Sequence, residues 1–331
     1  AADQVRSIPL FYGDHEGHFY LSDDAAWIRA QVQAQALDPL AAQEFLLTGY
    51  VTGPDTLLGC IKQLQAGEAV FIRRQGEQLA ACPQRYFRFL HHDPLEATED
   101  EFLQRLQDTL VGVFERLIQS ARGRQLVIPL SGGWDLRMVI TMLRYLGCRD
   151  VLAFSYGVPG NREAEISRRV AEALGYPWLF VPYARSLWRR WAASPEWEQY
   201  FAYAGQYASL AHIQDWPAVW QLREDGKIAQ DGIFVPGHSG TVAGSMHVFP
   251  TVLDDPKLDL GLVLRTILHE HYCLWHVPER MRSVLLERIR SRGIDGPVTG
   301  GEEAAGLLQF WDWQERHAKF AINSVRAEAF W

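Results

Sequence analysis

The fold of this chain is decided by residues 126–135, Leu126-Val127-Ile128-Pro129-Leu130-Ser131-Gly132-Gly133-Trp134-Asp135. The first five form a short continuous apolar run, which is typical of a buried parallel strand. A helical pattern begins at about Asp135 and extends to Leu146. The Gly132-Gly133 turn between them lets backbone N–H groups approach an anion closely, and the start of the helix adds the positive end of its dipole. The stretch therefore predicts a phosphate-binding site.

Strands and helices continue to alternate after this turn. Apolar strand patterns cover 151–156 and 178–181, and a helical pattern over 163–174 lies between them and is closed by Gly175. A further strand is predicted over 227–234. This alternation predicts a doubly wound α/β domain with a parallel sheet. Ligands of such sheets bind outside the carboxyl ends of the strands, which is where the Ser131 turn lies.

The chain before residue 93 has a different pattern. Short alternating segments predict strands of an antiparallel sheet at 8–12, 18–21 and 69–73, and a helix is predicted over 38–48. Residues 91–95, with Pro94, predict a linker. A capping box at Thr98 and Glu101 then opens a long helix that ends near Gly123. We therefore expect a smaller α+β domain over 1–92 and an α/β domain with a helical layer over 93–331.

Composition limits the partners of the protein. The 331 residues, 48% of them hydrophobic, suffice for two cores. A net charge of −8 argues against nucleic acid as the main partner, because phosphate contacts need clustered Lys and Arg. The four cysteines lie far apart, in neither metal-binding nor disulfide-framework spacing. No apolar run approaches the roughly 20 residues that span a bilayer, and no leader opens the chain. We therefore expect a cytoplasmic protein with no membrane partner; whether it forms a homo-oligomer stays open.

The glycine turn matches neither GxxxxGK[ST] nor GxGxxG, which disfavours a P-loop kinase or a dinucleotide enzyme. Residues 131–135 instead resemble the PP-loop, SGGxDS, of enzymes that split ATP between the α and β phosphates and activate a carboxylate as its adenylate. Segments 153–157, 160–163 and 170–175 resemble the second strand and the following helix of glutamine-dependent asparagine synthetases. The resemblance implies ATP and Mg²⁺ as cofactors. It places ATP on Leu130, Ser131, Gly132, Gly133, Trp134, Asp135, Ser155, Tyr156, Pro236 and Gly237, and the metal on Asp135.

The first part of the chain carries a second resemblance. Residues 3–12 resemble the DRxGxKPLYY strand of class II glutamine amidotransferase domains, 21–24 resemble the segment after it, and 46–67 resemble the run that ends the domain. The glutaminase nucleophile of that family is an N-terminal cysteine, whereas this chain begins Ala1-Ala2-Asp3 at a middle strand. We therefore expect a truncated amidotransferase-like domain to which no glutaminase activity is assigned. A longer precursor, a separate ammonia source and another nucleophile stay open.

Two positions near the loop depart from the asparagine synthetase pattern. Leu136 stands where the motif has Ser or Thr, which removes one hydroxyl contact to pyrophosphate. Residues 235–241 correspond to the GxGxDE segment, and Thr241 stands where the family has a magnesium-binding aspartate. Metal charge on the phosphates stabilises the transition state, so the absence of this aspartate is expected to slow turnover. His238 and Ser239 are candidates for the substrate pocket and for phosphate hydrogen bonds, or are loop residues without a catalytic part.

The substrate pocket has further candidates in the helical region. His212 and Asp215 are expected to form a polar wall, with Asp215 as a metal-binding or amine-binding carboxylate. Because Asp215 precedes Pro217, it is equally a candidate helix N-cap. The tryptophans of this region predict a bulky layer packed on the sheet or, alternatively, a platform for a carbohydrate or aromatic substrate; they are Trp188, Trp191, Trp197, Trp216 and Trp220.

The end of the chain resembles the family more weakly. Residues 314–326 are similar to a polar C-terminal helix that lines the synthetase cleft in asparagine-synthetase-related proteins. There a lysine over the phosphates stabilises the departing pyrophosphate, and the resemblance makes Lys319 the candidate catalytic residue, with Arg316 second. A charged amphipathic helix on the surface has the same pattern.

The sequence therefore predicts an asparagine synthetase-like, ATP-dependent, amide-forming ligase. The carboxylate of aspartate, a sugar acid or a peptide attacks the α-phosphorus, pyrophosphate leaves, and ammonia or an amine then displaces AMP. The alternative, which Leu136 and Thr241 motivate, is a nucleotide-binding homologue with impaired catalysis that acts as a partner or regulatory protein. Sulfur transfer to a nucleotide is discouraged, because the sequence lacks paired catalytic cysteines and basic patches.

Overall fold

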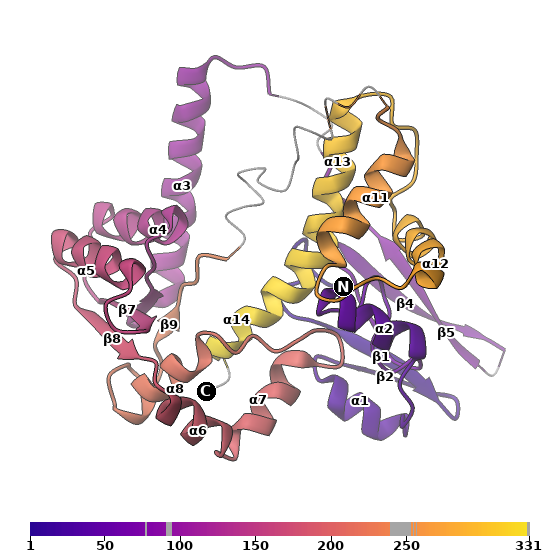
Figure 1. Ribbon diagram of the computed structural model, residues 1–331, viewed down its shortest axis with the longest axis horizontal. Helices are drawn as coiled ribbons and strands as arrows, with labels where there is room; N and C mark the ends of the chain where they lie inside the picture. The colour runs from indigo at the N-terminus through magenta and orange to yellow at the C-terminus, as the bar shows by residue number, and fades with distance from the viewer. Residues whose placement is uncertain (77, 91–94, 239–252, 254, 256, 330–331) are drawn as a thin grey trace. The chain divides into compact units, whose positions relative to one another are not determined.

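The computed structural model describes residues 1–76, 78–90, 95–238, 253, 255 and 257–329, and the chain divides into two compact units (Figure 1). Unit 1 comprises residues 1–92, 198–211 and 241–326, and unit 2 comprises 93–197, 212–240 and 327–331. Residues 198–211 and 241–326, which the sequence places in the second domain, belong to unit 1 in this division, and the two expected domains stay a prediction.

Unit 1 contains two antiparallel sheets. Strands β1 (Phe11–His15), β2 (His18–Ser22) and β3 (Lys62–Gln63) form the first in the order β2-β1-β3, and β4 (Glu68–Gln75) pairs with β5 (Gln78–Arg85) in the second. Strand β1 begins later than predicted, at Phe11, after Pro9, which has no backbone N–H to donate. Helices α1 (Ala25–Gln31) and α2 (Pro39–Thr48) complete this part. Asp38 caps α2 by accepting from the Ala41 N–H at 2.8 Å, as its place before the helix predicts.

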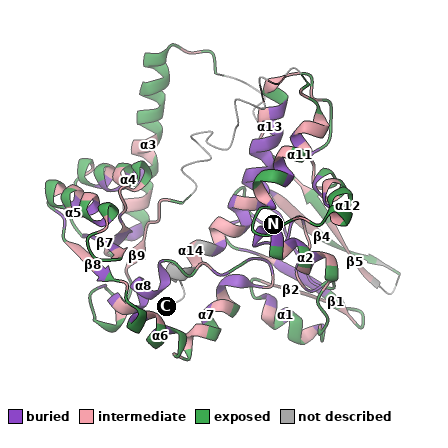
Figure 2. Ribbon diagram, viewed as in Figure 1, coloured by how far each residue is buried: buried purple, intermediate pink, exposed green. Residues whose placement is uncertain are grey.

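The C-terminal helices of unit 1 surround one apolar core. They are α11 (Leu260–His271), α12 (Glu279–Arg290), α13 (Gly301–Trp311) and the π-helix η1 (Asp312–Ala321), which α14 (Ile322–Ala329) continues; α7 (Glu196–Gly205) adds its C-terminal part. Figure 2 shows α13 as largely buried, and its Phe310 and Trp311 pack with Ile267 and Leu285 of the neighbouring helices. The core therefore joins residues that lie far apart in the sequence.

Buried charged side chains of η1 contact the backbone at Gly53 in the N-terminal part of unit 1. Lys319 and Glu315 have no exposed side-chain area and form an ion pair with each other. The Lys319 ammonium also donates to the Gly53 carbonyl at 2.8 Å, and the Gly53 N–H donates to Glu315 at 2.9 Å. Buried charges are tolerated when they are paired and hydrogen-bonded in this way. Lys319 thus holds two distant segments of unit 1 together.

Unit 2 is built on a four-stranded parallel sheet. Its strands are β6 (Leu126–Pro129), β7 (Val151–Gly157), β8 (Trp178–Pro182) and β9 (Ile233–Phe234), in the order β8-β7-β6-β9. Helices α3 (Glu99–Ala121), α4 (Trp134–Tyr145) and α5 (Arg162–Leu174) accompany the strands. Helix α3 begins at the predicted capping box of Thr98 and Glu101, and α5 ends at the predicted Gly175, whose backbone is left-handed. The predicted α/β fold, a parallel sheet preceded by small antiparallel sheets, is confirmed.

The strand order creates a switch point between β6 and β9. The chain moves in one direction from β6 to β8, so right-handed crossovers place α4 and α5 on one face of the sheet. It then returns past β6 to β9, and the returning segment carries α6 (Arg185–Ala192) and α8 (Trp216–Glu224). Neighbouring strands whose connections leave in opposite directions leave a crevice at their carboxyl ends. The predicted loop after β6 opens into that crevice.

The tryptophans of the returning segment form a packed layer. Trp191 and Trp216 are fully buried, and their ring centroids lie 4.8 Å apart. Trp197 contacts the Trp191 ring edge-on at 4.3 Å, and Trp188 does so at 5.4 Å. The structure therefore places the two central rings in the core of this layer, as the packing interpretation predicts.

Among the described residues, no helix combines the length and the apolar character that crossing a membrane requires.

Candidate functional site

A cavity of about 290 Å³ lies at the switch point of unit 2. It is lined by Pro129, Ser131, Gly133, Asp135, Leu136, Tyr156, His212, Gln214, Asp215, Gly237 and His238. Many of the residues that the sequence predicts to bind ATP or the substrate thus line the same cavity. They come from the ends of β6, β7 and β9 and from the segment that opens α8. The parallel sheet brings them together, because all its strands end at the same edge.

Ser155 holds the start of the loop after β6 through a side-chain hydrogen bond. Its hydroxyl donates to the Leu130 carbonyl at 2.5 Å and lies 2.6 Å from the hydroxyl of Ser167, which accepts from the indole N–H of Trp178 at 2.8 Å. Ser155 and Leu130 are both buried and neither lines the cavity. The sequence places ATP on both residues, whereas in the structure they anchor the turn on β7 and α5.

The backbone amides of the loop already hold oxygen atoms of the chain. The Gly132 N–H donates to Glu163 Oε2 at 2.6 Å, and the Gly133 N–H donates to Ser131 Oγ at 3.2 Å. A Cβ at position 132 would lie 2.5 Å from the same Glu163 oxygen, so only glycine leaves room for it. In the structure this amide thus donates to a carboxylate oxygen of the chain itself.

Helix α4 begins directly at the cavity. Its N-cap, Gly133, has no side chain to bond the first amides, so these face the hollow with the positive end of the helix dipole. Asp135 lies in the first turn, exposed and on the cavity wall. Trp134 is 80% exposed and instead carries the Arg137 guanidinium 3.9 Å above its ring. Of these two predicted ATP-binding residues, the structure brings Asp135 to the site and turns Trp134 outward.

Leu136 packs against the segment that follows β9. A Cβ at Gly237 would lie 2.6 Å from Leu136 Cγ, so the backbone after β9 rests directly on this side chain. Both residues line the cavity. The leucine therefore closes the floor between the β6 and β9 loops, where the family's motif has a polar group.

The segment after β9 lies beside the PP-loop-like turn. Strand β9 pairs with β6, and the Val235 N–H extends the ladder by donating to the Val127 carbonyl at 3.0 Å. Gly237 and His238 line the cavity, whereas Pro236 is half-buried and does not. Ser239 and Thr241 lie outside the described residues. The strand itself is shorter than the predicted 227–234, since only Ile233 and Phe234 pair.

The opposite wall consists of aromatic and polar groups. Tyr156, at the end of β7, stacks on Tyr183 with ring centroids 5.0 Å apart, and the Tyr183 hydroxyl donates to the Gln214 carbonyl at 2.6 Å. His212 Nδ1 lies 2.8 Å from Asp215 Oδ1. Asp215 occupies the N-cap position of α8, but its side chain makes no capping hydrogen bond. Asp215 is therefore the N-cap residue as predicted, but its carboxylate contacts His212 in place of the helix amides; its expected role as a metal-binding or amine-binding carboxylate stays a prediction.

Glu163 and Tyr183 were missed as site residues by sequence reasoning. A signal existed, because Glu163 lies within a few residues of the carboxyl end of β7 and Tyr183 directly follows β8, and side chains of parallel strands converge at this edge.

A magnesium ion that arrives with ATP needs one or two protein carboxylates, because phosphate oxygens and waters fill the rest of its octahedral shell. Asp135 fits this role, since it is exposed beside the loop amides. In the parts of the chain that the structure describes, no group of three or more His, Cys, Asp or Glu side chains could hold a metal. The donor set therefore fits a metal carried by the nucleotide phosphates, and Asp135 would hold it.

Lys319 and Arg316 belong to unit 1, not to this cavity. Lys319 is fully buried, and its ammonium forms an ion pair with Glu315 and donates hydrogen bonds to backbone carbonyls. Arg316 is 41% exposed and lies 3.8 Å from Asp312. The pyrophosphate-stabilising role expected of Lys319 and the alternative of a surface helix are both corrected: η1 is a buried structural helix.

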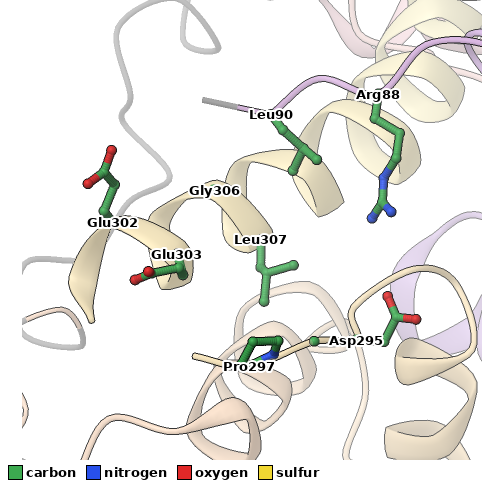
Figure 3. A pocket seen from close by; sticks show the side chains of 9 residues that line it. Arg88, Leu90, Asp295, Pro297, Glu302, Glu303, Gly306 and Leu307 are labelled. Carbon is green, nitrogen blue, oxygen red and sulfur yellow. The ribbon is translucent and has the colours of Figure 1, made fainter. Parts of the chain in front are cut away.

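A larger hollow of about 410 Å³ lies within unit 1 (Figure 3). Its charged groups have local structural tasks. Arg88 donates to the Gly293 carbonyl at 2.8 Å and lies over the Phe310 ring, while Glu302 and Glu303 occupy the first turn of α13, where negative charge stabilises a helix. Size alone therefore does not make this hollow the functional site.

Comparisons with known proteins add little to this geometry. No family model matches the chain, and no curated protein matches it. Among solved structures, the chain is similar to the NH3-dependent NAD synthetase of Campylobacter jejuni in complex with the nitrate ion, at 12% identity. The match covers 57% of this chain and 94% of that chain, with a TM-score of 0.30. A likeness at this level carries no argument about the site or its reaction.

Proposed function

We propose that unit 2 binds ATP in the switch-point cavity and activates a carboxylate as its adenylate, which ammonia or an amine then converts to an amide. The observation that carries this proposal is the convergence of the PP-loop-like turn, Asp135 and the His212–Asp215 pair on one cavity. The resemblance of residues 131–135 to the PP-loop supplies the reaction class.

The loop geometry supports cleavage between the α and β phosphates. The first turn of α4 would donate to a departing pyrophosphate, as would the Gly132 and Gly133 amides once Glu163 and Ser131 release them, and such donors stabilise charge as it develops. Asp135 would hold the metal that neutralises the phosphates. Adenylation turns the poor leaving oxide of a carboxylate into a good leaving group, so an amine can attack the acyl carbon and release AMP.

A second candidate function is nucleotide binding without turnover. Leu136 supports it, because an apolar side chain closes the floor where the motif supplies a hydroxyl. Glu163 supports it too, because its carboxylate occupies an amide that pyrophosphate needs. The two functions predict opposite results when pyrophosphate is measured.

The test is pyrophosphate release and exchange of labelled pyrophosphate into ATP, with magnesium and a panel of aspartate, uronic acids and peptide carboxylates, with and without ammonium chloride. We expect exchange with at least one carboxylate and a loss of at least about 100-fold in Asp135→Asn. Asp231→Asn is the matched control. Asp231 is exposed and lies just before β9, at the amino end of that strand, whereas the cavity lies at the carboxyl ends.

Binding of ATP without exchange for any carboxylate would refute the ligase and favour the second function. Equal exchange in wild type and Asp135→Asn would refute the placement of the metal. A similar loss in Asp231→Asn would show that removing a carboxylate remote from the cavity has the same effect, and would refute a specific role of Asp135.

A further inference from the structure

The His212–Asp215 pair is unusual in how its carboxylate is used. Asp215 has 4% of its side chain exposed, and its Oδ1 lies 2.8 Å from His212 Nδ1. At the N-cap of α8 an aspartate ordinarily bonds the helix amides, an interaction worth about 1 kcal/mol. Here the Ala218 and Val219 N–H groups bond the Asp215 backbone carbonyl, and the carboxylate is left to the imidazole. The fold thus commits a buried negative charge to one histidine.

This contact fixes the chemical form of His212. An ionised carboxylate only accepts hydrogen bonds, so Nδ1 carries the proton of the neutral ring. Proton exchange then falls to the other ring nitrogen, Nε2. Burial disfavours the charged imidazole, but the hydrogen bond and charge of Asp215, together with a hydrogen bond to the Gln214 side chain, outweigh burial and raise the pKa of His212. A histidine held in this way takes up a proton more readily than a free one.

His212 also lines the cavity to which the proposed function assigns the reaction. It shares the cavity wall with Ser131, Gly133 and Asp135, which the proposed function assigns to the phosphates and their metal. The titratable groups around it are Asp215, with which it pairs, His238, whose ring lies edge-on at 6.1 Å, and Asp135 and Tyr156 on the same cavity. The contact of the ring with Asp215 has hydrogen-bond length.

We propose that His212 is the general base of the amide-forming step and that Asp215 is its positioning residue. The proposal rests on the proposed function. The amine nitrogen attacks the acyl carbon of the adenylate, a C–N bond forms, and the bond from that carbon to the phosphate oxygen breaks. AMP leaves with the electron pair, and the proton of the amine passes to Nε2 of His212 and then to solvent.

The experiment separates the two half-reactions. Pyrophosphate exchange reports adenylation, and amide release with ammonium or a primary amine reports the second step. General-base catalysis contributes about 10²- to 10⁴-fold, so His212→Gln, which retains a donor for Asp215, is expected to lower amide release by about that factor. Its effect on exchange is expected to stay below about tenfold. His269→Gln is the matched control, because its side chain is 85% exposed and lies in unit 1.

Asp215→Asn gives a second readout. A general base acts when neutral, so amide release rises with pH as His212 loses its proton. Because Asp215 raises the pKa of His212, its replacement is expected to move this rise to lower pH and to reduce the plateau. A purely structural role of Asp215 would lower the rate without moving the profile.

The outcomes separate this inference from the proposed function. If wild type exchanges pyrophosphate and His212→Gln forms amide at the wild-type rate, only the general base is refuted. An equal loss of both half-reactions would make His212 a binding or structural residue. Absence of exchange in wild type overturns the proposed function and this inference together.

Discussion

Replacing Gly237 by alanine tests the floor of the cavity. The new Cβ would lie 2.6 Å from Leu136 Cγ and 3.1 and 3.4 Å from its two methyl carbons. Carbon atoms pack at about 3.5–4.0 Å, so the contact with Cγ is short by roughly 1 Å. Cγ is bonded to Cβ, and its rotamer is restricted by helix α4, so the side chain cannot turn away cheaply. Overpacking of this kind is expected to cost about 1–3 kcal/mol.

The matched variants make the origin of that cost measurable. Leu136→Ala removes the clashing atoms at its own cost, and the double variant Leu136→Ala/Gly237→Ala is expected to be more stable than the sum of the single changes predicts, by about 1–3 kcal/mol. Gly112→Ala, in α3, would meet only Arg116 Nη1 at 3.4 Å and is expected to gain up to about 1 kcal/mol from helix propensity.

The assay is urea unfolding, with hydrogen exchange of β6 and α4 peptides to assign the change to unit 2. Strict additivity of the Leu136 and Gly237 changes would refute the contact. So would a Gly237→Ala variant as stable as Gly112→Ala, because the backbone would then have room for a side chain.

The remaining predictions concern Glu163 and the buried pair of unit 1. Glu163→Ala removes the carboxylate on the Gly132 amide, so inorganic pyrophosphate is expected to bind about three- to tenfold tighter by calorimetry; weaker binding would mean that Glu163 helps to hold the anion. Lys319→Met leaves the Glu315 charge buried and is expected to cost about 3–5 kcal/mol in urea unfolding, with partial recovery in Glu315→Gln/Lys319→Met. Burial raises the pKa of Glu315, but Lys319 outweighs burial and lowers it below 4.5. The contribution of Glu315 to stability is therefore present above pH 4.5 and is lost as pH falls through its folded-state pKa, and acid unfolding of Glu315→Gln should lack this loss. Because burial lowers the pKa of Lys319 to about 8, the charged pair is confined to pH values below about 8.

The parallel sheet was predictable because its signals are local. The apolar run at 126–130, the capping box at Thr98 and the closing glycine Gly175 each act within a few residues of themselves, and the elements they specify appear in the structure. The common edge of parallel strands then placed Ser131, Tyr156 and Gly237 together without any knowledge of side-chain contacts.

The failures share a dependence on long-range contacts. Glu163 reaches the Gly132 amide across 31 positions, and Lys319 reaches Gly53 across 266. A polar helix with lysine and arginine indicates a surface, yet η1 is buried because its charges find partners on segments from the start of the chain. Asp215 occupies the N-cap position that its place before Pro217 indicates, but the sequence did not show that its carboxylate contacts His212 and not the helix amides.

The aromatic rings behind the cavity make its contents optically detectable. Tyr156 stacks on Tyr183, which lies 5.5 Å from Trp188, and Trp188 contacts the buried Trp191. Excitation energy absorbed by tyrosines at such separations passes to tryptophan, whose emission responds to its surroundings. A ligand that contacts Tyr156 is expected to change the share of excitation energy that reaches tryptophan. The packed rings are therefore expected to report ligand entry as a change in intrinsic fluorescence.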